Sequence, residues 1–210
     1  MLYYVTTNPG KIREARQYLG DETIVDYDYD YAEIQSESME TIAAEGARES
    51  YRKLGEPAVV DDSGLFIDGL DGFPGPYSSY VETKLGIDRV WTLAQTLDDR
   101  TASFRCVMAY CDGEPFESSP DPVDTDDRAA AAASAEASTE ETEPLPVKLF
   151  VGTVRGEIVA PRGDGGFGFD PIFEHDGATF AELSSEEKNA LSHRGRALAT
   201  FAEWYETRDA

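Results

Sequence analysis

The strongest constraint on the fold is a regular alternation of short apolar runs with segments of helical periodicity along the 210-residue chain. Runs rich in β-branched and aromatic residues are predicted to be strands: 2–7, 23–34, 57–62, 102–111 and 147–159. Segments with apolar residues at helical spacing are predicted to be helices: 11–20, 39–55, 88–97 and 187–206. This alternation predicts one α/β domain, residues 1–210, around a mixed sheet in which 102–111 and 147–159 form an antiparallel pair.

One segment interrupts this pattern. Residues 117–146 hold nine acidic residues, one Arg and no aromatic residue, so they cannot bury enough apolar surface to offset the entropy of ordering. We interpret 117–146 as an acidic, Ala-rich, solvated insertion between two strands, disordered or partly helical through its Ala run. Its charge does not account for the acidity of the protein, because the rest of the chain is strongly acidic as well.

The charge excludes several classes of partner. The chain has 42 acidic and 18 basic residues, a formal net charge of -24, which repels nucleic acids and anionic membranes. No apolar stretch is long enough for a membrane helix, and the start, MLYYVTTNPG, lacks the basic region of a signal peptide. We therefore expect a cytoplasmic protein with no nucleic-acid or membrane partner. The acidity also favours a halophile, because high salt screens the repulsion among the acidic side chains.

The two cysteines and two histidines do not suggest a metal cluster. Cys106 and Cys111 are five residues apart in one predicted strand, so their side chains point to opposite faces and cannot form a disulfide with each other. We expect both to be buried, reduced thiols. With His175 and His193 as the other soft ligands of the chain, a zinc site is not expected.

The segment TTNPGK, residues 6–11, lies between a predicted strand and a predicted helix. The first turn of a helix favours an anion, whereas a cation such as Lys11 is unfavourable there by itself. A phosphate group between the helix and Lys11 would resolve this conflict. The alternative is an Asn-Pro-Gly turn with a solvated Lys. The spacing of a Walker A loop is absent.

The segment GDGGFGFDP, residues 163–171, contains the spacing G-x-G-x-x-G at Gly163, Gly165 and Gly168. A dinucleotide-binding loop would be followed by a helix, but Pro171 disfavours helical geometry at the residue before it. We interpret the segment as a loop that displays Phe167 and Phe169, whose faces could stack on a base. The alternative, that an aromatic ring fills the core, applies to at least one of them.

The segment VVDDSGLFID, residues 59–68, carries two adjacent carboxylates from a buried strand toward a predicted Ser-Gly turn. Successive strand residues point to opposite faces, so one of Asp61 and Asp62 should meet solvent or cap the turn. The other could bind Mg²⁺, which prefers one or two carboxylates together with water and substrate phosphate. Glu33 is a possible second carboxylate, and the residues alone do not decide which Asp it accompanies.

Taken together, the motifs TTNPGK, DDSGL, GFPGPYSSY, GFGFDPIF and EEKNALSHRGRAL resemble the inosine/xanthosine triphosphate pyrophosphatase family. The resemblance extends from residue 2 to about residue 206 and fails across 117–146. It implies a two-lobed α/β fold around a long mixed sheet, with an active-site cleft between the lobes, and a homodimer. It also implies an enzyme that hydrolyses noncanonical purine nucleoside triphosphates (XTP, ITP and dITP) with Mg²⁺ to the monophosphate and pyrophosphate.

The resemblance also assigns roles to residues. Asp62 matches the family's catalytic carboxylate, as metal ligand and proton acceptor, and Glu33 matches its other metal-binding carboxylate. The matching substrate-binding positions are Thr6, Thr7, Asn8, Pro9, Gly10 and Lys11 for the triphosphate, Ser63 beside Asp62, and Phe167, Gly168, Phe169, Asp170, Lys188, His193 and Arg194 around the base and phosphates.

The chain departs from the family on the second helix, where many members have a phosphate-binding Lys and this sequence has Gly46. Arg48 is close to that position, but we do not assign it the role. Two alternative functions remain: a related pyrophosphatase that acts on pyrimidine or modified nucleotides, and a module that binds nucleotides without hydrolysis. The Glu33 and Asp62 carboxylates argue against a pure binding module, since binding alone does not need a metal-held pair.

Overall fold

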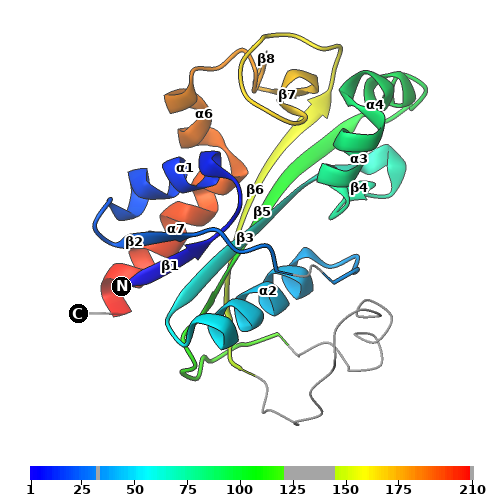
Figure 1. Ribbon diagram of the computed structural model, residues 1–210. Helices are drawn as coiled ribbons and strands as arrows, with labels where there is room; N and C mark the ends of the chain where they lie inside the picture. Colours follow the sequence, from blue (N-terminus) through cyan, green and yellow to red (C-terminus); the bar gives the residue numbers. More distant parts are fainter. Residues whose placement is uncertain (32–33, 121–144, 209–210) are drawn as a thin grey trace. The chain divides into compact units, whose positions relative to one another are not determined.

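The computed structural model describes residues 1–31, 34–120 and 145–208. Among these residues an eight-stranded sheet has the order β2-β1-β3-β5-β6-β7-β8, with β4 paired to β3 (Figure 1). The strands are β1 (Leu2–Val5), β2 (Ile24–Tyr27), β3 (Ala58–Ile67), β4 (Pro74–Gly75), β5 (Thr101–Cys111), β6 (Lys148–Ile158), β7 (Phe173–His175) and β8 (Ala178–Thr179). Parallel pairs join β1 to β2 and β3, and antiparallel pairs join β3 to β4 and β6 to β7, so the predicted mixed α/β fold is confirmed.

The helices begin and end where the sequence supplies caps. They are α1 (Pro9–Leu19), α2 (Met39–Leu54), α3 (Ser78–Leu85), α4 (Ile87–Ala94), α6 (Ser185–Leu191) and α7 (His193–Arg208). Asn8 and Ser38 accept backbone hydrogen bonds as N-caps of α1 and α2, and Ser184 forms a capping box with Glu187. Gly55 ends α2 in the left-handed conformation, which glycine adopts without strain.

The chain divides into two compact units. The described residues of 1–62 and 108–150 form the first, and those of 63–107 and 151–210 form the second. Each of the long strands β3, β5 and β6 contributes residues to both units. In the first unit, buried residues of β1, α1 and α2 such as Leu2, Tyr4, Ala15 and Ala43 form the core.

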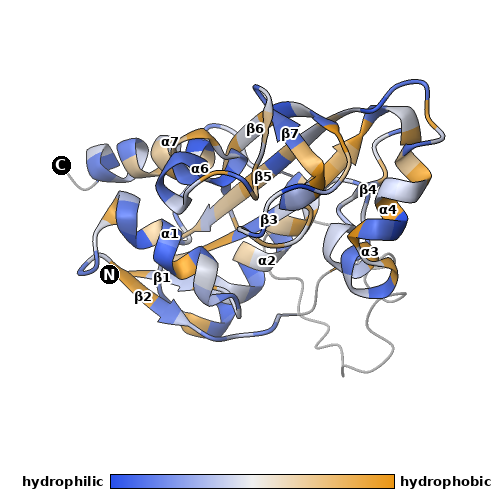
Figure 2. Cartoon of the chain, turned by 90° about the horizontal axis from the view of Figure 1, so that it is seen from above, coloured by the Kyte–Doolittle hydropathy of each residue, from blue (hydrophilic) through white to orange (hydrophobic). Residues whose placement is uncertain are grey.

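The core of the second unit is aromatic. Phe104 of β5 packs against Phe173 and Phe180, with ring centroids 4.5 and 5.8 Å away. These rings join a buried cluster that includes Leu65, Phe169 and other apolar residues. Figure 2 shows that both the strands and the helices carry orange, hydrophobic residues among blue, hydrophilic ones.

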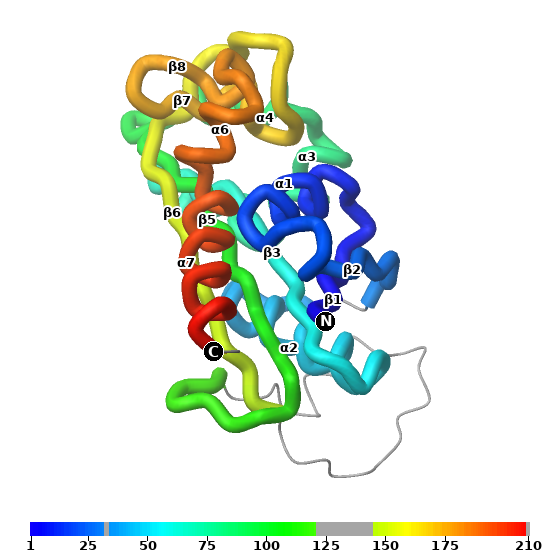
Figure 3. The backbone as a smooth tube through the Cα atoms, turned by 90° about the vertical axis from the view of Figure 1, so that its left-hand side faces the viewer, coloured from blue at the N-terminus to red at the C-terminus, as the bar shows by residue number. Residues whose placement is uncertain are grey.

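The long strands β5 and β6 run side by side (Figure 3). The N–H of Ile158, at the end of β6, donates to the carbonyl of Arg100 just before β5 at 2.9 Å, which agrees with the predicted antiparallel pair. The start of α7 approaches β6 closely at Gly152. A Cβ built on this glycine would lie 2.0 Å from the carbonyl oxygen of His193, so a larger residue would push α7 away.

Three predicted elements differ from the structure. The strand predicted at 23–34 ends at Tyr27, although the exposure of Asp and partial burial of Tyr continue to alternate through Asp30. The period-two pattern persists beyond the strand because Tyr29 turns toward α2, where its hydroxyl donates to Glu49 at 2.7 Å. This hydrogen bond raises the pKa of Tyr29 to about 12.

The helix predicted at 187–206 is two helices, α6 and α7, which are separated at Ser192. Ser192 has an extended backbone, with φ -68° and ψ 156°, and its side chain accepts from the N–H of Gly195 at 3.0 Å. It is therefore an N-cap inside what reads as one periodic segment. The predicted turn at Ser63-Gly64 is also wrong, because β3 continues to Ile67.

The structure also bears on the predictions for the cysteines, the acidic insertion and membrane helices. Cys106 and Cys111 are both buried thiols, as expected, and burial raises the pKa of Cys111 to about 11. Most of the predicted acidic insertion, residues 121–144, lies outside the described residues. None of the helices in the described parts of the chain is long and apolar enough to cross a membrane.

Candidate active site

The predicted phosphate-binding segment connects β1 to α1 in the first unit. Thr7, Asn8 and Pro9 are exposed, and the side chain of Asn8 accepts from the N–H of Gly10 at 2.8 Å. The hydroxyl oxygen of Thr6 accepts from the N–H of Asn8 at 3.2 Å, and this local hydrogen bond stabilises the turn between β1 and α1. Pro9 occupies the first turn of α1, where its missing N–H costs no hydrogen bond. The segment therefore exposes a capped helix start without any acidic residue in its first turn.

Lys11 extends from this helix start to Asp61 on β3. Its Nζ lies 3.1 Å from Oδ2 of Asp61 and donates to the Asp61 carbonyl oxygen at 2.8 Å. The other carboxylate oxygen of Asp61 accepts from the buried hydroxyl of Tyr4 at 2.7 Å. The Asp61 side chain is fully buried, while 18% of the Lys11 side chain is exposed. Asp61 is thus the member of the pair that does not meet solvent and holds Lys11 in place, whereas Asp62 is the partly exposed one.

Asp62 lies next to Asp61 on β3 and is half-buried. Because strand residues alternate, its side chain points to the opposite face from the Lys11–Asp61 pair. The described parts of the chain contain no group of three His, Cys, Asp or Glu residues that could hold a metal ion. Glu33, the other predicted metal ligand, lies outside the described residues.

In the second unit, the glycine-rich loop divides its two aromatic residues between core and surface. Phe169 is 4% exposed and joins the core, whereas Phe167 is 50% exposed. No dinucleotide-type helix follows the loop, because residues Asp170–Ile172 form a single 3-10 turn that leads into β7. Phe167 is thus displayed as predicted for the loop, and its face is available to a ligand. Phe169 follows the alternative prediction, that at least one of the two rings fills the core.

Asp170 organises the surroundings of Phe167. Its Oδ2 accepts from the N–H of Phe167 at 2.7 Å and from Nζ of Lys188 at 2.5 Å. Nζ of Lys188 in turn lies 4.1 Å from the centre of the Phe167 ring, within the range of a cation–π contact. Gly166 makes this arrangement possible, because a Cβ built there would lie 2.2 Å from Oδ2 of Asp170 and its φ is +72°.

The start of α7 brings two more predicted residues to the same place. Arg194 is 4% exposed; its Nη2 donates to the hydroxyl of Ser63 at 3.2 Å, and its guanidinium lies 5.8 Å from the centre of the Phe167 ring. His193 is buried, and its ring stacks on Phe104 at 4.8 Å. Ser63, Phe167, Asp170, Lys188 and Arg194 are therefore one connected group, while His193 is anchored in the core beside them.

The sequence does not reveal how two residues of this arrangement act. Tyr4 is predicted only as part of a strand, and Asp61 only as a residue that supports Asp62 or caps a turn, although Tyr4 donates to Asp61 and Asp61 holds Lys11. The possible signal for Asp61 was the burial of the apolar run directly before it. Arg48, which the sequence leaves without a role, is 1% exposed and binds Glu45 at 2.6 Å, Leu145 and Pro120, so its guanidinium is engaged inside the first unit.

These features define an α/β protein whose first unit has a capped helix start beside Lys11, which favours an anion, and whose second unit has an aromatic ring flanked by cations. Comparison with known proteins identifies the family: the chain belongs to the Ham1 family, which matches residues 2–121 and 118–204. The resemblance seen in the sequence motifs is thereby confirmed.

Individual relatives match over nearly the whole chain. The dITP/XTP pyrophosphatase of Methanosarcina mazei is 44% identical over 208 residues, which is 97% of this chain and 96% of the relative. The inosine triphosphate pyrophosphatase of Aspergillus fumigatus is 36% identical over 206 residues, covering 98% and 94%. Among solved structures, a HAM1 protein from Coxiella burnetii matches with a TM-score of 0.74 and 31% identity, covering 99% of this chain and 100% of that one.

Proposed function

We propose that this protein hydrolyses noncanonical purine nucleoside triphosphates, XTP, ITP and dITP, to the monophosphate and pyrophosphate. The observation that carries the proposal is the connected group around Phe167, in which buried Lys188 and Arg194 flank an exposed aromatic face. Family membership and relatives named dITP/XTP pyrophosphatase support the same reaction.

The second unit supplies groups for the base. A purine stacked on the exposed face of Phe167 would gain about 1–3 kcal/mol, as base–aromatic stacks do. Lys188 and Arg194 carry N–H donors close to that ring. Hypoxanthine and xanthine present a keto oxygen at the 6-position, which accepts such donors, whereas adenine presents an amino group. A buried donor left without an acceptor costs about 1–3 kcal/mol, so we expect ATP to be hydrolysed roughly 5- to 150-fold less efficiently.

The first unit supplies groups for the phosphates. Thr6 to Lys11 form a capped helix start whose dipole and backbone N–H groups favour an anion. Asp61 holds Nζ of Lys11 with two contacts, so the cation is already in position when a phosphate arrives. The conflict of a cation at a helix start is resolved by this buried carboxylate, and a phosphate would be a second partner for Lys11.

Asp62 is proposed to accept the proton of the attacking water and, with Glu33, to hold Mg²⁺. A half-buried carboxylate such as Asp62 suits Mg²⁺, which keeps several waters and binds through one or two carboxylates and the substrate phosphate. When bound, Mg²⁺ would neutralise the leaving pyrophosphate. Asp62 is suited to the proton transfer because it points to the opposite face of β3 from the buried ion pair, which Asp61 forms with Lys11.

The central experiment measures pyrophosphate release from XTP, ITP, dITP, GTP, ATP, dTTP and UTP with Mg²⁺, at low and at molar salt. Faster hydrolysis of dTTP or UTP than of ITP and XTP would favour the alternative of a pyrimidine-directed pyrophosphatase. The two salt conditions also test whether the acidic composition is an adaptation to high salt. Sedimentation of the same preparation tests the homodimer that we propose for the enzyme.

The catalytic assignment is tested with Asp62→Asn. We expect turnover of ITP to fall about 10²- to 10⁴-fold, the usual contribution of a general base, while ITP binding stays measurable. Asp68→Asn is the matched control, because Asp68 is an exposed carboxylate that directly follows β3 and contacts only Arg155, at 3.5 Å, among the described ion pairs. Turnover of Asp62→Asn at the wild-type rate would refute the role of Asp62, and binding without turnover by the wild type would favour a non-hydrolysing module.

A further inference from the structure

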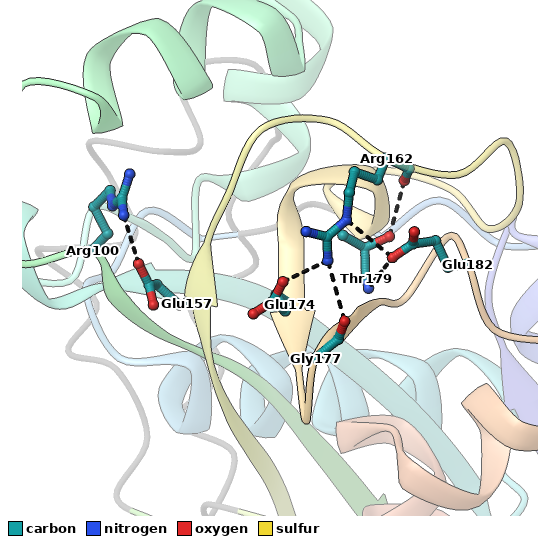
Figure 4. Close-up of polar contacts among 7 residues, drawn as sticks. All are labelled: Arg100, Glu157, Arg162, Glu174, Gly177, Thr179 and Glu182. Carbon is teal, nitrogen blue, oxygen red and sulfur yellow. Dashed lines mark hydrogen bonds and ion pairs between the residues drawn. The ribbon is translucent and has the colours of Figure 1, made fainter.

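Arg162 lies directly before the glycine-rich loop, residues 163–171, and its side chain contacts the segment around β7 and β8 (Figure 4). Its Nη2 lies 2.5 Å from Oε2 of Glu174 on β7, and its Nε lies 3.2 Å from Oε2 of Glu182 after β8. The backbone of Arg162 is also held, since its N–H donates to Pro171 at 2.9 Å and its carbonyl accepts from the Thr179 hydroxyl at 2.9 Å.

The loop that follows Arg162 rests directly on residues 181 and 182. The N–H of Gly165 donates to the carbonyl of Ala181 at 3.1 Å. A Cβ on Gly163 would lie 2.6 Å from the carbonyl carbon of Ala181, and a Cβ on Gly165 would lie 2.7 Å from its oxygen. The glycines therefore permit a close approach, and the Arg162–Glu182 ion pair lies beside it.

The same segment leads to the aromatic ring proposed to stack on the base. The N–H of Ala181 donates to the carbonyl of Asp170 at 3.3 Å. The carboxylate of Asp170 then holds the N–H of Phe167 and Nζ of Lys188. Arg162 is thus connected to Phe167 and Lys188 in three steps. It pairs with Glu182, the neighbouring Ala181 bonds to the backbone of Asp170, and the carboxylate of Asp170 holds Phe167 and Lys188.

We propose that Arg162 is a positioning residue for nucleotide binding: by bridging Glu174 and Glu182 it holds the glycine-rich loop on residues 181 and 182 and so fixes Phe167 for the base. This inference rests on the proposed function. Arg162 contacts neither the Phe167 ring nor Lys188 in any described interaction, so it acts through the loop and not on the substrate.

The arrangement differs from an ordinary surface ion pair. An isolated exposed pair contributes little, because solvent screens it and ordering two long side chains costs entropy. Arg162 instead joins two carboxylates, and Glu182 also accepts from the N–H of Thr179 at 2.7 Å. These contacts raise the pKa of Arg162 and lower the pKa of Glu182, for Glu182 chiefly through the Thr179 N–H.

The experiment compares Arg162→Ala, Arg162→Lys and Arg100→Ala. Arg100 is the matched control, because it is similarly exposed and forms a 2.8 Å pair with Glu157 that involves no loop residue (Figure 4). We expect Arg162→Ala to raise KM for ITP about 10-fold, within the roughly 5- to 150-fold that loss of a whole base–aromatic stack would give, with kcat within about threefold of the wild type. Arg162→Lys keeps one donor group and should give an intermediate KM, and Arg100→Ala should leave both constants unchanged.

A second readout does not depend on turnover. Hydrogen–deuterium exchange of the peptide that contains Gly165 and Phe167 should be faster in Arg162→Ala than in the wild type and in Arg100→Ala. Unchanged exchange would overturn the proposal whatever the activity, and faster exchange with unchanged KM would overturn the connection to nucleotide binding. If the wild type hydrolyses none of the nucleotides, the proposed function fails, whereas the exchange measurement still decides whether Arg162 holds the loop.

Discussion

Arg48 on α2 provides the sharpest test of how the first unit is built. Its side chain is 1% exposed and pairs with Glu45 at 2.6 Å. Its Nε donates to the carbonyl of Leu145 at 2.9 Å, and its Nη2 donates to the carbonyl of Pro120. One guanidinium therefore connects α2 to Pro120 and to Leu145, two described residues that are 25 positions apart in the sequence. This geometry indicates a structural role for Arg48, the residue close to the position where many members of the family have a phosphate-binding Lys.

The structural role has a calculable consequence for Arg48→Met. Removing one partner of a buried ion pair leaves the Glu45 carboxylate buried without its cation, which typically costs about 3–5 kcal/mol. The two carbonyls add less, because Leu145 and Pro120 are half-buried and water can replace the lost donors. For a chain of this length, about 3–5 kcal/mol corresponds to a fall in melting temperature of roughly 6–20 °C.

The assay is thermal unfolding combined with steady-state kinetics at a temperature where the variant remains folded. We expect Arg48→Met to lose stability with little change in KM, and the exposed Arg52→Met on the same helix to stay within about 0.5 kcal/mol of the wild type. The double variant Glu45→Leu/Arg48→Met should recover most of the loss, because no unpaired charge remains. A melting temperature within about 2 °C of the wild type together with a clearly raised KM would refute the structural role and favour phosphate binding.

Two further predictions follow from single sites. Gly166→Ala should cost about 2–5 kcal/mol and raise KM, because it combines a strained φ of +72° with a clash against Asp170, whereas Gly55→Ala, in the left-handed conformation with φ +68° and nothing within 4 Å, should lose only about 1–2 kcal/mol; equal losses in thermal unfolding would contradict this. Burial raises the pKa of Cys111 from 9.0 to about 11, so its neutral form adds stability that is complete below pH 9 and lost as the pH rises through 11. Alkylation of Cys111, followed by mass spectrometry, should therefore be slow at pH 8, with about 0.1% thiolate, and faster by about tenfold per pH unit; rapid alkylation at pH 8 would argue against it.

The sequence predicted the elements whose burial follows a simple period. The α/β class, the antiparallel strands β5 and β6, and the helices α1, α2 and α4 follow from apolar spacing, with ends shifted by at most three residues. The strands β4, β7 and β8 were not predicted, because two or three residues are too few for a period to appear, and α3 was not predicted, because Val81 is its only buried apolar residue. The break at Ser192 was missed for another reason: the apolar stripe continues across it, and only the capping contact with Gly195 marks it.

In the candidate site, the sequence predicted several residues but not the residues that they contact. Lys11, Phe167 and Arg194 were predicted from residue type and motif, and the structure places each at a helix start or in a loop, as expected. What could not be predicted is which acceptor holds each cation, since the partners are distant in sequence. Asp61 is 50 residues from Lys11, and Ser63 is 131 residues from Arg194. Such pairs depend on strand register, which no local pattern specifies.

These pairs explain how a protein with a net charge of -24 can present cations to an anionic ligand. Lys11 and Lys188 each pair with a carboxylate that is nearly or fully buried, Asp61 and Asp170, within their own units. Buried pairs are screened by salt far less than exposed ones, so these cations keep their places at low or molar salt alike. A buried ion pair is weak support for stability, because apolar residues of similar volume often serve as well. We therefore infer that these two pairs, which lie next to the segments proposed to bind the phosphates and the base, serve to place cations for a nucleotide more than to stabilise the fold.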